Sequence, residues 1–116
     1  MSDDLASKRC ASCEGGVPPL DAARVRNYLG RVQGWALNED GKRIRRSWRV
    51  KDFATGLDFF NRVGSVADAE DHHPDLHLSN YRDVTIEIWT HAIGGLSEND
   101  FILAAKIDRL PVELEK

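Results

Sequence analysis

The chain has 116 residues and a mass of 13.0 kDa, a length typical of one domain with its own hydrophobic core. Its 16 Lys and Arg residues against 19 Asp and Glu residues give a net charge of -3, which argues against a broad positive surface and a direct nucleic-acid partner. Because no apolar run is long enough to span a bilayer and the first ten residues lack an apolar signal-peptide core, we expect a cytoplasmic protein without membrane association.

The N-terminal segment contains both cysteines, Cys10 and Cys13, as a single CxxC motif among polar, Gly and Pro residues. A four-ligand zinc site needs a second ligand pair, and a thioredoxin-type motif lies between a strand and a helix. Neither context follows here, so reduced thiols are favoured, while a metal shared with another subunit or a distant histidine stays open. We predict a flexible arm over residues 1–19 and one folded domain over residues 20–116.

The first elements after this arm are a short helix and a β-hairpin. Apolar residues at near-helical spacing predict a helix over residues 20–29, with Gly30 as its end. Residues 35–37 and 44–53 then alternate apolar and polar side chains on either side of an Asp40-Gly41 turn. This alternation predicts two antiparallel strands.

A second helix is predicted from residue 54 to about residue 71. Its apolar stripe consists of Leu57, Phe60, Val63 and Ala67. Thr55 and Asp58 fit a capping box at its start. Pro74 disfavours the α conformation in His73, so we expect the chain to become extended at this point.

The last part of the chain predicts a second hairpin and a third helix. Residues 76–78 and 84–91 alternate around a turn near Tyr81, and residues 97–110 return to helical spacing. Ser97 and Asp100 form a second possible capping box. The order α-β-β-α-β-β-α predicts an α+β domain in which a single four-stranded antiparallel sheet has helices packed on one face.

All four histidines lie between Ala69 and His91. Imidazole can act as an acid or a base near neutral pH. His72 and His73 are expected at the C-terminal end of the second helix, where the helix dipole and nearby carboxylates favour the charged ring. The second hairpin should bring His91 back to the C-terminal end of the second helix, close to His72 and His73. His77 has the parity of an ordinary exposed strand residue, so we assign it no role.

Other interpretations of the same residues remain open at this point. A metal site is the main chemical alternative, but adjacent residues of an extended chain point to opposite faces, so His72 and His73 do not readily bind one ion. The histidines can also be structural, bonded to helix carbonyls. Helix capping alone would explain Asp100, and packing or an interface would explain Trp89.

Several motifs together resemble the pterin-4a-carbinolamine dehydratase family. They are Asp68, His72-His73-Pro74, Tyr81, Thr90-His91, Gly95-Leu96-Ser97 and Asp100, with Gly34-Trp35 and the segment Val50 to Phe53. The resemblance covers nearly everything after residue 20. It implies a homodimer or homotetramer assembled through sheet edges and helices. It also implies removal of water from 4a-hydroxytetrahydrobiopterin to give quinonoid dihydropterin, in tetrahydropterin recycling, without a metal or an organic cofactor.

The resemblance also implies roles for individual residues. The active-site histidines would be His72, His73 and His91. The substrate-binding residues would be Asp71, His72, His73, Trp89, Thr90, His91 and Ala92, with Asp68 and Asp100 in support. We expect His72 and His91 to transfer protons and His73 to orient the site, although coupled groups do not have fixed individual roles. The alternative is a non-catalytic binding or assembly factor of the same fold; retention of all three histidines favours the enzyme.

Overall fold

The computed structural model describes residues 5–10 and 18–115. Its main elements are α1 (Ala22–Leu29), β1 (Ala36–Leu37), β2 (Ile44–Arg49), α2 (Phe53–Glu70), β3 (Asp75–Ser79), β4 (Asp83–Ile88) and α3 (Glu98–Asp108). Two short 3-10 helices, η1 (Leu5–Ser7) and η2 (His91–Ile93), precede α1 and α3. This order confirms the predicted α+β fold. Within the described ranges, no helix is long and apolar enough to cross a membrane.

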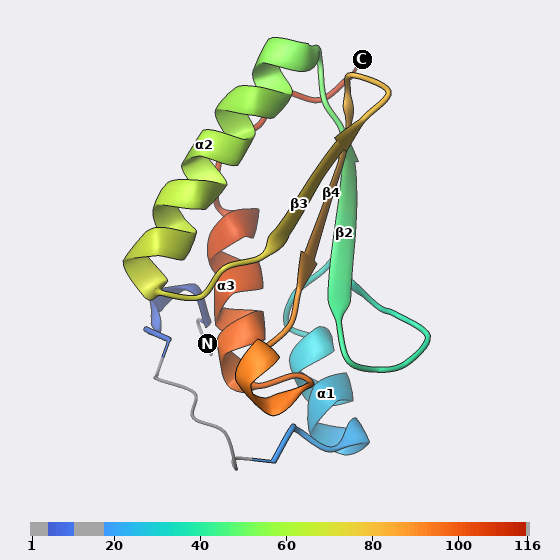
Figure 1. Ribbon diagram of the computed structural model, residues 1–116, viewed down its shortest axis with the longest axis vertical. Coiled ribbons are helices and arrows are strands. Elements are labelled where there is room, and N and C mark those ends of the chain that lie inside the picture. The colour runs from blue at the N-terminus through green and yellow to red at the C-terminus, as the bar shows by residue number, and fades with distance from the viewer. Residues whose placement is uncertain (1–4, 11–17, 116) are drawn as a thin grey trace.

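The four strands form one antiparallel sheet in the order β1-β2-β4-β3, with α2 and α3 side by side over one face (Figure 1). That face is apolar because alternate side chains of β2 and β4 point toward the helices. The buried ones are Ile44, Trp48, Val84, Ile86 and Ile88. Along β2 the opposite face carries the exposed residues Arg45, Ser47 and Arg49. Hydrophobic burial between the sheet and the helices therefore fixes which face each strand presents.

Helix α2 begins with a different cap than we expected, and its predicted apolar stripe is correct at Val63 and Ala67 but not at Leu57. Asp52 caps it by accepting hydrogen bonds from the Thr55 backbone N–H (2.9 Å) and hydroxyl (2.7 Å), so the predicted capping box is wrong. Leu57 is 44% exposed, and the buried stripe is Gly56, Phe59, Val63 and Ala67. A Cβ on Gly56 would lie 3.3 Å from a Leu78 methyl group, so glycine lets the helix approach β3 closely through this side.

The N-terminal segment also differs from the expected flexible arm where the structure describes it. Leu5 is only 2% exposed and belongs to the hydrophobic core beside α3. The Lys106 ammonium donates a 2.8 Å hydrogen bond to the Ala6 carbonyl. Burial of one leucine, which the polar composition of the arm did not suggest, orders this segment. Cys13 lies outside the described residues, so the CxxC motif as a unit does so too.

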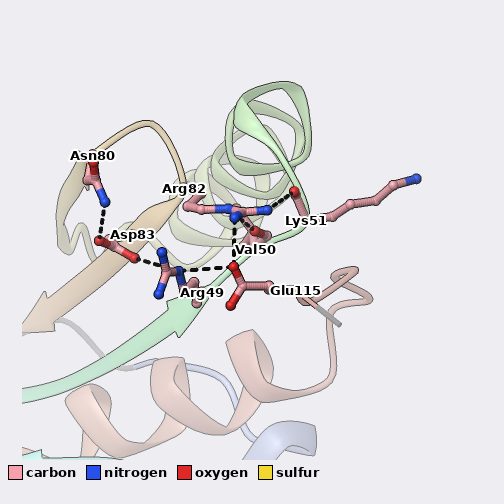
Figure 2. Close-up of polar contacts among 7 residues, drawn as sticks. All are labelled: Arg49, Val50, Lys51, Asn80, Arg82, Asp83 and Glu115. Carbon is pink, nitrogen blue, oxygen red and sulfur yellow. Dashed lines mark hydrogen bonds and ion pairs between the residues drawn. The ribbon is translucent and has the colours of Figure 1, made fainter.

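The C-terminal segment closes the end of the sheet at the β3–β4 turn (Figure 2). It pairs with the end of β2 through backbone hydrogen bonds from Lys51 to Glu113 (3.0 Å) and from Glu115 to Arg49 (2.9 Å). The Arg82 guanidinium donates to the carbonyls of Val50 and Lys51 and to the Glu115 carboxylate. These contacts pair the backbone polar groups at this end of the sheet within the protein. The histidines lie at the opposite end.

Candidate active site

The sheet register brings the two histidine-bearing segments together. Asp75 at the start of β3 pairs with Glu87 near the end of β4, so the chain entering β3 lies beside the chain leaving β4. A cleft of about 560 Å³ opens there. Its lining includes all of the expected substrate-binding residues, Asp71, His72, His73, Trp89, Thr90, His91 and Ala92. The structure therefore brings together residues that are up to 21 positions apart in the chain.

His72 is held at the end of α2 by the helix terminus and by Asp100. Asp71 has left-handed backbone angles (φ 52°, ψ 41°), and the His72 backbone N–H donates to the Ala67 carbonyl at 3.1 Å. The His72 side chain is 11% exposed, and its Nε2 lies 2.6 Å from Asp100 Oδ1. When Asp100 is ionised, its carboxylate can only accept hydrogen bonds, so His72 Nε2 is then the donor of this bond. Nδ1 is the nitrogen that remains for other partners.

Asp100 both caps α3 and anchors His72. Its side chain is fully buried, and its Oδ2 accepts hydrogen bonds from the Ser97 backbone N–H (2.8 Å) and the Thr90 hydroxyl (2.9 Å). The predicted capping box of Ser97 and Asp100 is confirmed. A buried carboxylate requires several donors to offset its lost hydration, and the cap supplies them. The same backbone turn that starts α3 therefore presents Oδ1 to His72.

Thr90 connects the end of β4 to this network. It is 3% exposed, and its backbone N–H donates to the Gly95 carbonyl at 2.9 Å. Its hydroxyl also lies 2.8 Å from the Ser97 hydroxyl. Thr90 thus lines the cleft, but its hydroxyl is directed to Asp100 and Ser97, which makes it a positioning residue for the carboxylate.

His91 lies in η2 rather than in a strand, because β4 ends at Ile88 and the Thr90–Gly95 pairing folds the chain back. Its imidazole packs against Trp89, with the ring centroids 4.1 Å apart at 51°. Across the residues that the structure describes, this ring has no hydrogen-bond or ion-pair partner. The exposed ring nitrogens can therefore form hydrogen bonds to a molecule bound in the cleft.

His73 and Asp68 form a weaker, exposed pair. His73 Nε2 lies 3.0 Å from Asp68 Oδ1, and the two side chains are 58% and 82% exposed. An ion pair of this exposure contributes little to stability. His77 is 56% exposed and is not among the residues that line the cleft, in keeping with an ordinary strand position. Among the described residues, no group of three or more His, Cys, Asp or Glu side chains is arranged to hold a metal ion.

A family model described as pterin 4 alpha carbinolamine dehydratase matches residues 18–110, which include the whole set of histidines. The chain belongs to this family. A dehydratase relative from Arabidopsis thaliana, named pterin-4-alpha-carbinolamine dehydratase 2, mitochondrial, is 52% identical over 113 residues. These residues cover 95% of this chain and 60% of the relative.

Two further family members match over nearly their whole length. A putative pterin-4-alpha-carbinolamine dehydratase from Halorhodospira halophila is 47% identical over 91% of this chain and 96% of its own. The crystal structure of a transcriptional coactivator/pterin dehydratase from Brucella melitensis superposes with a TM-score of 0.72 at 29% identity, over 78% of this chain and 95% of that one. The arrangement of strands and helices is therefore shared with a solved dehydratase.

Five residues that line the cleft were not anticipated as site residues, and two of them, Pro74 and Asp75, directly follow His73. The other three are Cys10, Glu70 and Asn99. They come from the N-terminal segment, the end of α2 and the start of α3. The available signals were weak, since Leu5 is the one large apolar residue between Met1 and Cys10 and Glu70 and Asn99 merely adjoin expected residues.

Proposed function

We propose that this protein dehydrates a 4a-hydroxytetrahydropterin, with 4a-hydroxytetrahydrobiopterin as the expected substrate, to the quinonoid dihydropterin in tetrahydropterin recycling. The observation that carries the proposal is the convergence of His72 and His91 on one cleft, with His72 anchored by a buried carboxylate. Membership of the dehydratase family supports the same reaction.

The chemistry requires two proton transfers. The C4a–O bond breaks and its oxygen leaves as water after gaining a proton, while N5 loses a proton as the C4a=N5 double bond forms. We assign one transfer to His72 and the other to His91, with His73 and Asp68 orienting the site. Asp100 keeps the His72 ring in one orientation and compensates the positive charge of its protonated form. A reaction that needs one charged and one neutral imidazole at once has a bell-shaped pH dependence.

A direct assay tests this proposal. The 4a-hydroxytetrahydropterin is generated in situ, and formation of the quinonoid product is followed by absorbance with and without the protein at pH 7. We expect the protein to accelerate the dehydration, also after the protein has been dialysed against a strong chelator, because the proposed groups are imidazoles and no cofactor takes part. The absence of acceleration would favour the alternative, a binding or assembly factor of the same fold. Loss on dialysis that one equivalent of zinc restores would assign the histidines to a metal.

We also propose that the protein acts as a homodimer or homotetramer in the cytoplasm, with no direct nucleic-acid or membrane contact. Strand β3 forms one edge of the sheet, and Phe53, Leu57 and Leu76 are 50%, 44% and 37% exposed. Open sheet edges and exposed large apolar side chains are features of surfaces that associate. The Arabidopsis relative is named as mitochondrial, so fractionation of cells that express the tagged protein tests the cytoplasmic location.

A further inference from the structure

Residues 5–10, here called the N-terminal strap, lie along α3 and lead to the histidine cleft (Figure 1). The strap is anchored at its start by the buried Leu5 side chain and by the hydrogen bond from Lys106 to the Ala6 carbonyl (2.8 Å). The Lys8 ammonium pairs with the Glu98 carboxylate at 2.8 Å. Three separate contacts therefore hold the strap against one helix.

The last residue of the strap, Cys10, links the two elements that carry the His72–Asp100 pair. Its backbone N–H donates a 2.8 Å hydrogen bond to Glu70, which ends α2 two residues before His72. Its thiol donates to the carbonyl of Asn99, at 3.6 Å, one residue before Asp100. Cys10 thus occupies the junction at which α2, α3 and the cleft meet.

The Glu70 carboxylate connects Cys10 to Lys106 of α3. Its side chain is 9% exposed, and its second carboxylate oxygen lies 3.6 Å from the Lys106 ammonium. The hydrogen bond from the Cys10 backbone lowers the pKa of Glu70, and Lys106 acts in the same direction. Lys106 therefore contacts both the start of the strap and the carboxylate that holds its end.

The Cys10 side chain is suited to contact and unsuited to nucleophilic chemistry. Burial raises the pKa of Cys10 to about 12, and the neighbouring Glu70 carboxylate also raises it. The thiol of Cys10 is therefore neutral near neutral pH. Because the thiolate is the reactive form, this neutral thiol is a poor nucleophile. A neutral, polarisable sulfur packs well against a flat heteroaromatic ring.

We propose that the strap is a wall of the substrate pocket and that Cys10 contacts the bound pterin and sets its position against His72. This inference rests on the proposed function and extends it to a segment that precedes the part of the chain matched by the family model. Cys10 acts by shape and contact, and the strap acts by keeping Cys10 at the junction of α2 and α3.

The main test compares Cys10→Phe with Ser7→Phe, which places the same ring on an exposed residue of the strap. Because the larger side chain at position 10 fills part of the cleft, Cys10→Phe should raise the KM for the 4a-hydroxytetrahydropterin at least about tenfold, with a smaller effect on kcat. It should raise the Kd for 7,8-dihydrobiopterin, read by tryptophan fluorescence, to a similar extent. Ser7→Phe should change either constant less than about twofold.

A second pair of variants tests the anchoring of the strap. Lys106→Met removes the bond to Ala6 and the charge next to Glu70, and should raise KM and Kd several-fold while the circular dichroism spectrum is retained. Lys51→Met is the control, because Lys51 is 58% exposed at the opposite end of the sheet. Cys10→Ala, which enlarges the cleft without crowding it, should raise KM by less than Cys10→Phe.

The readouts separate this inference from the proposed function. If the wild-type protein binds 7,8-dihydrobiopterin without dehydrating the carbinolamine, the proposed reaction fails and the Kd values still test the strap. If the wild-type protein is active and folded Cys10→Phe retains its KM and Kd, the strap is no part of the pocket and the inference is overturned.

Discussion

At the residue scale, the site depends on how one buried carboxylate is shared. Asp100 accepts hydrogen bonds from the start of α3, from Thr90 and from His72. The sequence predicted its cap from the three-residue spacing to Ser97, because a cap is a local feature. Its bond to His72 spans 28 positions, and no periodicity encodes such a distance. The contacts of Cys10 with Glu70 and Asn99, 60 and 89 positions away, were unpredictable for the same reason.

The two proton-transfer histidines are tested by alanine substitution. His72→Ala or His91→Ala should lower dehydratase turnover by at least about 100-fold, as expected when a general acid or base is lost. His77→Ala is the matched control, since His77 lies outside the cleft, and its turnover should equal that of the wild type. Circular dichroism checks the fold of each variant. Turnover within a few-fold of wild type for either cleft variant contradicts the assignment.

Asp100→Asn separates the charge of this residue from its shape. The amide keeps an oxygen for one partner but loses the carboxylate that faces His72, so turnover should fall by about 10- to 100-fold, as for other residues that orient a reacting ligand. Its pH profile should also change on one limb, which loss of packing alone would not cause. Asp68→Asn, at an 82% exposed position beside His73, should have a much smaller effect. Equal effects of the two variants would refute the anchoring role.

The protonation of Cys10 predicts slow alkylation. In a Cys13→Ser background, Cys10 is the single thiol of the chain. A rise in its pKa from 9.0 to about 12 lowers the thiolate fraction near pH 8 by about 1000-fold. The folded protein should therefore react with iodoacetamide far more slowly than the same protein in urea, and the rate should rise with each pH unit up to about 10. Equal rates in the folded and unfolded protein at pH 8 would show a normal thiol.

At the element scale, the strands and helices followed from periodicity, while their packing faces and ends required long-range contacts. Helix α2 was predicted within a few residues, but its buried face turns toward Gly56 and Phe59 because Gly56 permits close approach to β3. Strand β4 was expected to reach His91 and stops at Ile88. The chain turns there because Gly94 adopts a positive φ of 66° and Thr90 pairs with Gly95, neither of which an alternating pattern reveals.

Gly64 provides a test of the description of α2. It lies inside the helix, and a Cβ added to it would meet nothing within 4 Å. Gly64→Ala should therefore increase the free energy of unfolding by about 0.5–1 kcal/mol, because alanine loses less conformational freedom in a helix. Gly94→Ala also has open space but a positive φ, so it should destabilise the protein. Urea unfolding measures both. Destabilisation by Gly64→Ala would indicate that this surface of α2 packs against something else.

At the scale of the whole molecule, the two ends of the sheet differ in structure. Arg82 and the C-terminal segment close one end with internal hydrogen bonds (Figure 2). The other end holds the cleft, where α2, α3 and the strap converge around His72. Among the described residues β3 pairs with β4 and with no other strand, so the outer edge of β3 is open. The surface that is open to a second subunit therefore lies along the β3 edge of the sheet.

That unpaired side predicts self-association. An edge strand with free backbone groups, next to apolar side chains as exposed as Leu57 (44%) and Leu76 (37%), favours pairing with a second copy over exposure to water. Sedimentation equilibrium at micromolar concentration should give a mass of two or four times 13.0 kDa. Leu57→Glu, which places a charge on this surface, should shift the equilibrium toward the monomer. Leu37→Glu, on β1 at the opposite edge of the sheet, should leave it unchanged. A single species of 13.0 kDa for the wild type would contradict the oligomer, and a shift caused by Leu37→Glu alone would move the interface to the β1 edge.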